Sequence, residues 1–368
     1  MLIQLLPALA GACAAFAFGL LLTAGARRIG WVDGGAGAHK LAGERWPLTG
    51  GAALLAGWLA AEFTAEFTAQ FTADFTARAL AATPRPLFEA AELAALLEGL
   101  VGGEVRLWPL GALCAAFALG TLDDLLENGL SAGAKLCGQA LCGLVLVAPS
   151  LLLHGASSTA SLLALLAVAG ACIALNCINT FDNADGAALG VGLLGLSGAA
   201  SLAAPLVGFA PLNLVADRPG TWRRKAILGD AGSHALGLVV LLHPNAWPAL
   251  TLPALDLARL CWVRWRLGEP VWRGDRRHLA HRLARGGLAP WRVALLLVAL
   301  AAPAALAPWG WELAAGIAAS ALLLVWSLRC SPQRAEPSAA GAAARPNAGA
   351  LAPTGAEANV SAAGTART

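Results

Sequence analysis

Long uncharged blocks alternate with short charged clusters along this chain. Residues 1–26 carry no charged side chain and are followed by Arg27 and Arg28, while residues 136–181 contain no Asp, Glu, Lys or Arg. A helix needs about 20 apolar residues to cross a hydrocarbon core roughly 30 Å thick. The first block therefore predicts one membrane-spanning helix, and the second predicts two helices that turn near 149–158.

The remaining apolar stretches predict further membrane segments of two kinds. Four of them suit single helices: 46–61, 107–122, 290–308 and 309–328. Two others, 186–216 and 231–255, are uncharged but too short for two full spans each. They predict short or re-entrant hairpins, with a turn around Pro205 and a break at Pro244 and Pro248. The expected fold is all-α and polytopic, with about eleven membrane segments.

Two segments outside these spans have a biased composition. Residues 62–77 read EFTA-EFTA-QFTA-DFTA, which we interpret as an expanded low-complexity loop rather than a binding face. The loop belongs to an acidic external segment, 62–104, for which partial helicity is expected. The tail 331–368 is rich in Ala, Gly, Pro and Ser without periodicity, which predicts disorder. Residues 1–330 are expected to form one integral membrane domain.

Basic residues predict the orientation of the chain. Cytoplasmic loops carry an excess of Lys and Arg. Arg27 and Arg28 follow the first span, and the stretch 218–225 contains four more basic side chains. With both regions inside, the N-terminus lies outside. The expected location is the inner (plasma) membrane, with the polar clusters on its cytoplasmic face.

The composition supports a membrane protein and limits the classes of partner that we expect. Of the residues, 58% are hydrophobic and 13% charged, against roughly 45–50% and about 25% in soluble domains. An ordinary water-soluble enzyme is thereby excluded, and the lipid bilayer becomes the first expected partner. The net charge of +3 is too small and scattered to indicate nucleic acid. The eight cysteines form no C-x-x-C pair, so neither a disulfide nor a zinc site is expected.

Five carboxylates gather at the predicted cytoplasmic helix ends. They are Asp123, Asp124, Asp182, Asp185 and Asp230. A single one could mark the place where a helix leaves the bilayer, but buried acidic groups are costly, and five on one side favour a functional site. The adjacent pair Asp123-Asp124 suits Mg²⁺, which takes oxygen ligands and often bridges to substrate phosphates. Mn²⁺ could replace it.

Neutral and basic side chains extend these acidic clusters. Lys135 lies four residues before Gln139, so the two share a helix face, and the lysine could contact a phosphate. A polar residue recurs every third position at Asn176, Asn179, Asp182 and Asp185. Asp230 lies between Gly229 and Gly232. A helix is predicted to follow, and its N-terminal N–H groups suit an anion.

A basic loop completes the set of candidate groups. Residues 274–283 read GDRRHLAHRL and include His278, His281 and Arg282. Such a loop suits a diphosphate, although it could also be an ordinary cytoplasmic basic loop. Together the clusters predict a Mg²⁺-dependent site for phosphoryl chemistry at the inner membrane surface.

In their order along the chain, these clusters resemble the polyprenyl-phosphate N-acetylhexosamine-1-phosphate transferases. The matching segments are HKLAGERWPLTGG (39–51), TLDDLLENGLSAGAKLCGQ (121–139), NCINTFDNADGA (176–187), RRKAILGDAGSHALG (223–237) and GDRRHLAHRL (274–283). The resemblance runs from about Trp31 to Leu283. It implies transfer of a sugar 1-phosphate from a UDP-sugar to undecaprenyl phosphate, with release of UMP, at the start of cell-wall or lipopolysaccharide synthesis.

The resemblance also implies a role for each matching residue. Asp123 and Asp124 match a catalytic pair, of which one deprotonates or positions the lipid phosphate and the other helps to organise Mg²⁺. Asp230 matches a metal ligand, with Asp124 as its expected partner. The remaining positions are expected to bind substrate, and these are Lys135, Asn179, Asp182, Asp185, His278, His281, Arg282, His39 and Lys40.

Departures from the family pattern leave the substrate and the activity open. The basic loop 274–283, called the histidine loop below, looks more like that of the family's N-acetylglucosamine branch than that of its muramoyl-pentapeptide branch. His234 stands where an aliphatic residue is usual, Ala280 replaces a histidine, and the two hairpins are short. The alternatives are a phospho-N-acetylmuramoyl-pentapeptide transferase and a non-catalytic lipid-phosphate transporter or scaffold. A homodimer is left open.

Overall fold

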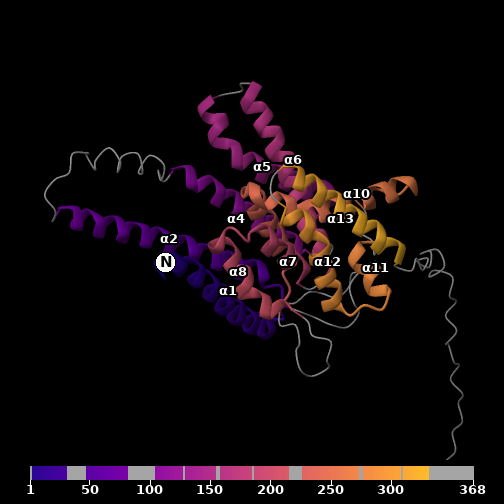
Figure 1. Cartoon of the computed structure of the whole chain (residues 1–368), viewed down its shortest axis with the longest axis horizontal. Coiled ribbons are helices and arrows are strands. Elements are labelled where there is room, and N and C mark those ends of the chain that lie inside the picture. The colour runs from indigo at the N-terminus through magenta and orange to yellow at the C-terminus, as the bar shows by residue number, and fades with distance from the viewer. Residues whose placement is uncertain are drawn as a thin grey trace, which may run out of the picture. The chain divides into compact units, whose positions relative to one another are not determined.

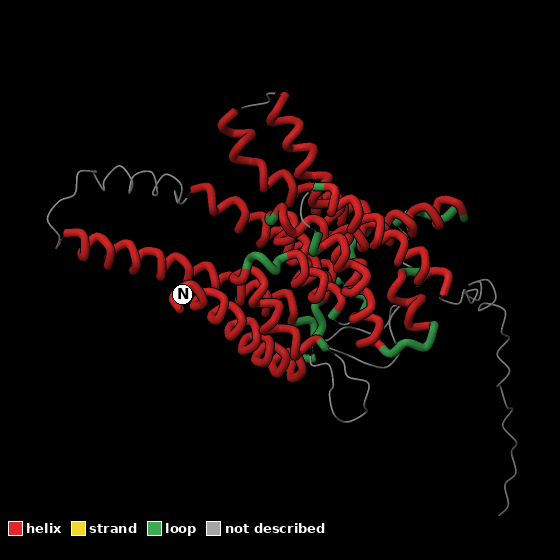
Figure 2. Tube along the Cα trace, viewed as in Figure 1, coloured by secondary structure: helices red, strands yellow, loops and turns green. Residues whose placement is uncertain are grey.

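The described part of the chain is entirely helical. The computed structural model describes residues 2–30, 47–81, 104–126, 129–154, 158–184, 186–214, 226–272, 277–307 and 310–330. Within these ranges there is no strand (Figure 2), only an isolated parallel bridge between Leu48 and Ile227. The predicted all-α fold is confirmed for these residues. The chain divides into two units, Met1–Pro332 and Gln333–Thr368, and the second, with the tail predicted to be disordered, lies outside the described residues.

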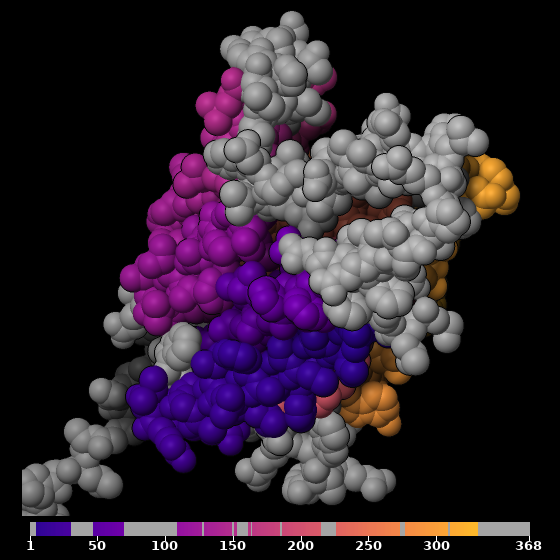
Figure 3. Space-filling model, turned by 90° about the vertical axis from the view of Figure 1, so that its left-hand side faces the viewer, coloured from indigo at the N-terminus to yellow at the C-terminus, as the bar shows by residue number. Residues whose placement is uncertain are grey.

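The N-terminal half contains the longest helices (Figure 1). They are α1 (Leu2–Ile29), α2 (Gly50–Ala81), α4 (Glu104–Leu125), α5 (Ala132–His154) and α6 (Ser158–Phe181). Arg27 and Arg28 lie in the last turn of α1, where the sequence predicts the end of the first span. Figure 3 shows α1 and α2 lying against each other on the face turned to the viewer. Along the chain, α5 and α6 likewise pack as neighbours.

The C-terminal half is built from shorter elements. They are α7 (Ala187–Gly195), α8 (Ala200–Asn213), α9 (Gly229–Leu242), the 3₁₀ helix η1 (Pro244–Leu250), α10 (Thr251–Arg266), α11 (Leu279–Arg285), α12 (Pro290–Ala305) and α13 (Trp311–Cys330). The break predicted at Pro244 and Pro248 is confirmed, because η1 begins at the first of these prolines and contains the second.

Several of these helices are suited to a membrane. Three are long and apolar enough to cross one: Leu5–Ile29, Ala164–Phe181 and Trp311–Arg329. Four shorter apolar helices accompany them: Ala132–Ala148, Ala200–Asn213, Gly229–Leu242 and Pro290–Ala305. These helices are consistent with a membrane protein, and the total of about eleven segments stays a prediction.

The first predicted hairpin is short, but its turn lies elsewhere than expected. Helices α7 and α8 have 9 and 14 residues, or about 14 and 21 Å at 1.5 Å per residue, less than a bilayer core. The turn falls at Leu196–Ala199 and not around Pro205, which lies inside α8. Within α8, the Pro205 ring packs at Gly57 of α2, where a Cβ would come within 2.7 Å of it.

The EFTA repeats belong to a helix. Helix α2 continues through 62–77 to Ala81, so the loop interpretation is wrong for the repeats, while the partial helicity expected of 62–104 is confirmed as far as Ala81. The threonine hydroxyls are accommodated within this helix. Thr64 Oγ1 donates to Ala60 O at 2.7 Å and Thr68 Oγ1 to Thr64 O at 2.8 Å, so these polar groups are satisfied inside the helix.

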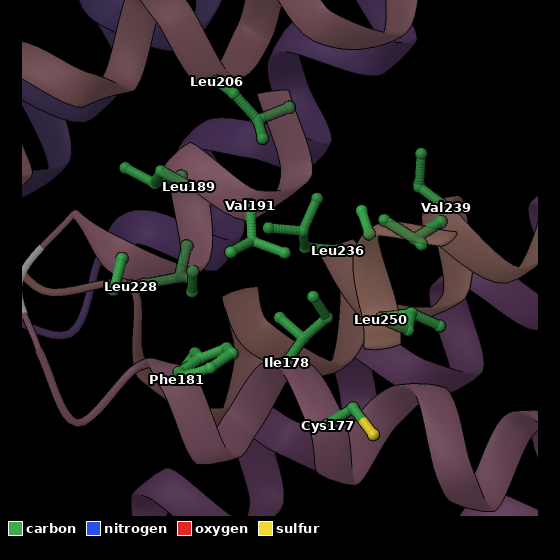
Figure 4. Packing of buried hydrophobic residues seen from close by; sticks show 14 of the residues in the cluster. Cys177, Ile178, Phe181, Leu189, Val191, Leu206, Leu228, Leu236, Val239 and Leu250 are labelled. Carbon is green, nitrogen blue, oxygen red and sulfur yellow. The ribbon is translucent and has the colours of Figure 1, made fainter. Parts of the chain in front are cut away.

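Helix α9 lies at the centre of the apolar core. It packs against α2, α4 and α6, and most of its residues from Gly229 to Val240 are buried. Figure 4 shows Leu236 of α9 beside Val191 of α7 and Ile178 of α6. A helix that is apolar all round is typical of a buried position. The first turn of α9, which carries Asp230, is therefore held rigidly by its neighbours.

Candidate functional site

Four helix ends bring five of the predicted site residues together. Asp123 and Asp124 lie in the last turn of α4, Lys135 in the first turn of α5, Asn179 in the last turn of α6 and Asp230 in the first turn of α9. These helices pack against one another in the pairs α4·α5, α5·α6, α4·α9 and α6·α9. We call the five residues the carboxylate cluster.

Lys135 joins two carboxylates that are far apart in the sequence. Its Nζ donates to Asp123 Oδ2 at 2.9 Å and also to Asp230 Oδ2. The side chains of the lysine and the two aspartates are only 21%, 14% and 24% exposed. Removing one partner of a buried ion pair is strongly destabilising, because the other charge is left uncompensated. Lys135 therefore determines the charge balance of the cluster.

The second carboxylate oxygen of each of these two aspartates, Oδ1, is also hydrogen-bonded. Asn179 Nδ2 donates to Asp230 Oδ1 at 2.6 Å and to Ser233 Oγ at 3.0 Å. The backbone N–H of Leu130 donates to Asp123 Oδ1 at 2.6 Å. Each oxygen of Asp123 and Asp230 thus has a protein partner that fixes its direction, which is the kind of preorganisation that phosphoryl chemistry requires.

Asp124 has a different environment from its neighbour Asp123. Its Oδ1 accepts the N–H of Asp230 and its Oδ2 accepts the N–H of Ala231, both at 3.0 Å. The first N–H groups of a helix have no partner within it, and Leu228 at the N-cap of α9 makes no side-chain cap. Asp124 supplies this cap from another helix, with its negative charge at the positive end of the helix dipole.

Two glycines allow this close contact between α4 and α9. A Cβ at Gly120 would lie 2.2 Å from Asp230 O, and a Cβ at Gly229 would lie 2.7 Å from Asp124 Oδ2. Gly229 also has a φ of +71°, which favours glycine. The backbone of Asp230 can therefore approach α4 only because both positions lack a side chain.

Sequence reasoning missed the part played by three residues directly behind the cluster. Gln139 and His234 are buried, and Asn176 is partly buried. His234 Nδ1 lies 2.7 Å from Asp230 O, and its Nε2 lies 3.2 Å from Gln139 Nε2. Asn176 Nδ2 donates to Gln139 Oε1 at 2.7 Å. The signal was present in the sequence, because Asp230 and His234 have the same four-residue spacing as Lys135 and Gln139.

The chemistry of the cluster fits a divalent cation that shares its ligands with a substrate. Three carboxylates and one ammonium leave two negative charges uncompensated. Among the described residues, no group of three or more His, Cys, Asp or Glu side chains is arranged to hold a metal, and Asp124 faces the α9 backbone. Asp123 and Asp230 remain, and one or two carboxylates together with substrate phosphates are the usual ligands of Mg²⁺.

The histidine loop is held by a residue that the sequence analysis did not select. Asp256 of α10 is 1% exposed. Its Oδ2 accepts the N–H of Leu279 at 3.1 Å, at the start of α11. Its Oδ1 accepts from Arg259 Nε at 2.9 Å and Nη2 at 2.7 Å, and that Nη2 also donates to Arg277 O. This buried carboxylate thus ties α10 to both residues that flank His278.

His278 is the N-cap residue of α11, while His281 and Arg282 lie on the helix, which packs against α12 and α13. The rings of His278 and His281 meet edge to face, with centroids 6.2 Å apart, and Arg282 Nη2 donates to Leu328 O at 2.8 Å. Burial lowers the pKa of Arg282, and the nearby Arg259 and Arg285 lower it further. The structure thus groups these three predicted residues with each other and with α10 and α13.

One of the remaining predicted site residues lies at the end of α6. Asp182 directly follows α6, where its N–H donates to Ile178 O at 3.1 Å. Gly186, four residues later, is fixed by the buried Asn213, whose Oδ1 accepts its N–H at 2.8 Å. His39, Lys40 and Asp185 lie outside the described residues.

Comparisons with known proteins do not extend this picture. No model of a known protein family matches the chain, and no curated protein matches its sequence. The resemblance to the sugar-1-phosphate transferases therefore rests on the sequence motifs alone.

Proposed function

We propose that this protein transfers a sugar 1-phosphate from a UDP-sugar to a polyprenyl phosphate at the membrane surface, with release of UMP. The observation that carries the proposal is the joint placement of Asp123, Lys135 and Asp230 at converging helix ends. A fixed ammonium between two carboxylates, with a net negative charge left for Mg²⁺, suits a site that handles phosphate groups.

In the proposed reaction, an oxygen of the lipid phosphate forms a bond to the sugar-bearing phosphorus. The bond between that phosphorus and the bridging oxygen breaks, and the electron pair leaves with UMP. Asp123 orients the attacking lipid phosphate and takes its proton where one is present. Lys135 donates to a phosphate oxygen and stabilises charge there. Asp230 would hold Mg²⁺ together with Asp123, in place of the expected Asp124, whose oxygens accept N–H groups of α9. The ion would supply charge neutralisation.

The histidine loop is proposed to bind the diphosphate of the sugar nucleotide. His278, His281 and Arg282 supply donors for phosphate oxygens. Asn179, Asp182 and Asp185 are proposed to bind the nucleotide, where the two carboxylates accept hydrogen bonds from its N–H or O–H groups. His39 and Lys40 are proposed as further phosphate contacts. N-acetylglucosamine 1-phosphate is the proposed group, in the first membrane step of envelope polysaccharide synthesis on the cytoplasmic face of the inner membrane.

A second function is favoured by one observation. All four oxygens of Asp123 and Asp230 already have protein partners, so the cluster is electrostatically supported in the absence of a metal. That arrangement suits a non-catalytic protein that binds lipid phosphate through Lys135. The transferase requires Lys135 to release a carboxylate when Mg²⁺ and substrate arrive.

The test is release of UMP from UDP-N-acetylglucosamine by purified protein in detergent. We expect release that depends on both undecaprenyl phosphate and Mg²⁺, and that falls about 10²-fold or more in Lys135→Gln, since one preorganised donor is worth that much. Arg329→Gln, which removes a cation in the last turn of α13, is the matched control and should retain activity.

Three results would contradict or redirect the proposal. Undecaprenyl phosphate binding without UMP release would favour the non-catalytic alternative. Release from UDP-muramoyl-pentapeptide alone would assign the protein to the other substrate branch. Equal loss in Lys135→Gln and Arg329→Gln would show that charge removal in general, and not the cluster, limits activity.

A further inference from the structure

A neutral polar layer lies directly behind the carboxylate cluster. Three helices each contribute a residue to the cluster and a second residue about one turn away: Lys135 and Gln139 from α5, Asn179 and Asn176 from α6, Asp230 and His234 from α9. Residues three or four apart lie on one helix face. The three rear residues therefore meet one another just as the three front residues do.

The contacts of His234 determine its tautomer. Asp230 O can only accept a hydrogen bond, so Nδ1, which lies 2.7 Å away, carries the proton. Nε2 is then the acceptor, and Gln139 Nε2 donates to it at 3.2 Å. This orientation turns Gln139 Oε1 toward Asn176 Nδ2, which donates at 2.7 Å. Every donor in the chain of contacts has an acceptor, and the whole chain is neutral.

Such a network specifies one alignment of the helices. His234 is fully buried and Gln139 is 1% exposed, so a shift of His234 away from Gln139 would leave an amide or a ring nitrogen without a partner. Buried polar groups that are fully satisfied specify a unique packing, because the misaligned alternatives leave them unpaired. An aliphatic residue at 234 would leave the Gln139 amide without this acceptor.

We propose that His234 is a positioning residue, which locks α9 to α5 through Gln139 and so sets the reach of Asp230 toward Lys135. The link is short: His234 contacts Asp230 O directly, and Gln139 is one turn from Lys135. The catalytic consequence of this lock rests on the proposed transferase function. Its structural consequence, the pairing of Lys135 with Asp230, does not.

Three substitutions at His234 separate its two contacts. His234→Gln places an amide near the position of Nε2 and retains the link to Gln139. His234→Asn places an amide near Nδ1 and retains only the contact within α9. His234→Leu removes both. His243→Leu is the matched control, because this residue lies at the C-cap of the same helix, away from the network.

The first measurement needs no catalysis. Purified protein is treated with a small amine-acylating reagent, and modification of Lys135 is followed by mass spectrometry. We expect His234→Leu and His234→Asn to be modified about threefold faster or more than the parent, the factor expected when a typical hydrogen bond is lost. His234→Gln and His243→Leu should match the parent.

The second measurement uses UMP release. We expect His234→Leu to lower kcat by roughly 10- to 100-fold, because a misplacement of about 1 Å can cost 10²-fold. The Mg²⁺ concentration for half-maximal activity should rise with little change in the KM for the UDP-sugar, and His234→Gln should restore both. If the parent releases no UMP, the proposed function fails, and Lys135 labelling alone decides the positioning role.

Clear outcomes would overturn the proposal. Parent-like labelling of Lys135 in folded His234→Leu would show that the network does not set the ion pair. Rescue by Asn but not by Gln would show that only the contact within α9 matters. A uniform loss of folded protein in all three variants, with no restoration by Gln, would assign His234 to general core packing.

Discussion

Adjacent residues have opposite surroundings in the carboxylate cluster. Asp123 faces Lys135, whereas both oxygens of Asp124 accept N–H groups of α9. Successive helix positions point about 100° apart, so two neighbouring side chains cannot both face the same partner. In this adjacent pair, Asp123 therefore balances the charge of Lys135, and Asp124 accepts hydrogen bonds from the backbone of α9.

This division predicts different effects for two conservative variants. Asp124→Asn turns an NH₂ toward backbone N–H groups and loses the charged cap, so we expect a loss of about 1–2 kcal/mol in stability, seen as a lower Tm. Asp123→Asn leaves the cap intact and should lower kcat about 10²-fold, with a smaller change in Tm. Equal effects of the two variants on both Tm and kcat would contradict the division.

Pairs of elements are held together where glycines replace side chains. Helices α4 and α9 approach at Gly120 and Gly229, and Pro205 of α8 packs at Gly57 of α2. Close approach of this kind is common in membrane helices, because small residues let the backbones pack tightly. The position of Asp230 is thus a property of the helix pair rather than of α9 alone.

Helix α4 offers a test of its close approach to α9 and a matched control in the same helix. In Gly120→Ala the new Cβ would meet Asp230 O at 2.2 Å, whereas at Gly111 the nearest atom is Val145 Cγ1 at 3.8 Å. We expect Gly120→Ala to destabilise the protein by about 1–3 kcal/mol through overpacking. Gly111→Ala should be neutral or slightly stabilising. Thermal unfolding in detergent measures both, and a parent-like Tm for Gly120→Ala would show that α4 and α9 can separate without cost.

At the scale of the whole molecule, the candidate chemistry is divided between two groups of helices. The carboxylate cluster is carried by α4, α5, α6 and α9, and the histidine loop by α10 and α11. Acidic residues organise both groups, the partly buried Asp124 in the first and the buried Asp256 in the second. The proposed reaction needs both, because the metal and the diphosphate must meet at one substrate.

Weakening the loop alone should therefore affect nucleotide binding more than chemistry. Asp256→Asn weakens the hydrogen bonds to Leu279 and Arg259 but leaves the carboxylate cluster unchanged. We expect the KM for the UDP-sugar to rise about tenfold with kcat within a factor of about two, the signature of a lost ground-state contact. Glu312→Gln, in the first turn of α13, is the control. A fall in kcat at unchanged KM would place the loop in the chemical step.

The sequence by itself determined the all-helical class, the apolar helices, the break at Pro244 and the residues that gather at helix ends. These follow from local properties, namely the length of apolar runs and the spacing of polar residues three or four apart. For the same reason the EFTA repeats could be mistaken for a loop, since a four-residue period suits a helix as well as a low-complexity segment.

Only the tertiary structure decided which partner each polar group has. Lys135 meets Asp230 across 95 positions, and Asp124 caps a helix 106 positions away. Nothing local distinguishes Asp123 from Asp124 or marks Asp256 as an anchor, and the four-residue spacing of Asp230 and His234 does not show which residue His234 contacts on another helix. Their roles depend on which helix faces pack together, and that choice comes from burial and close approach summed over the whole core.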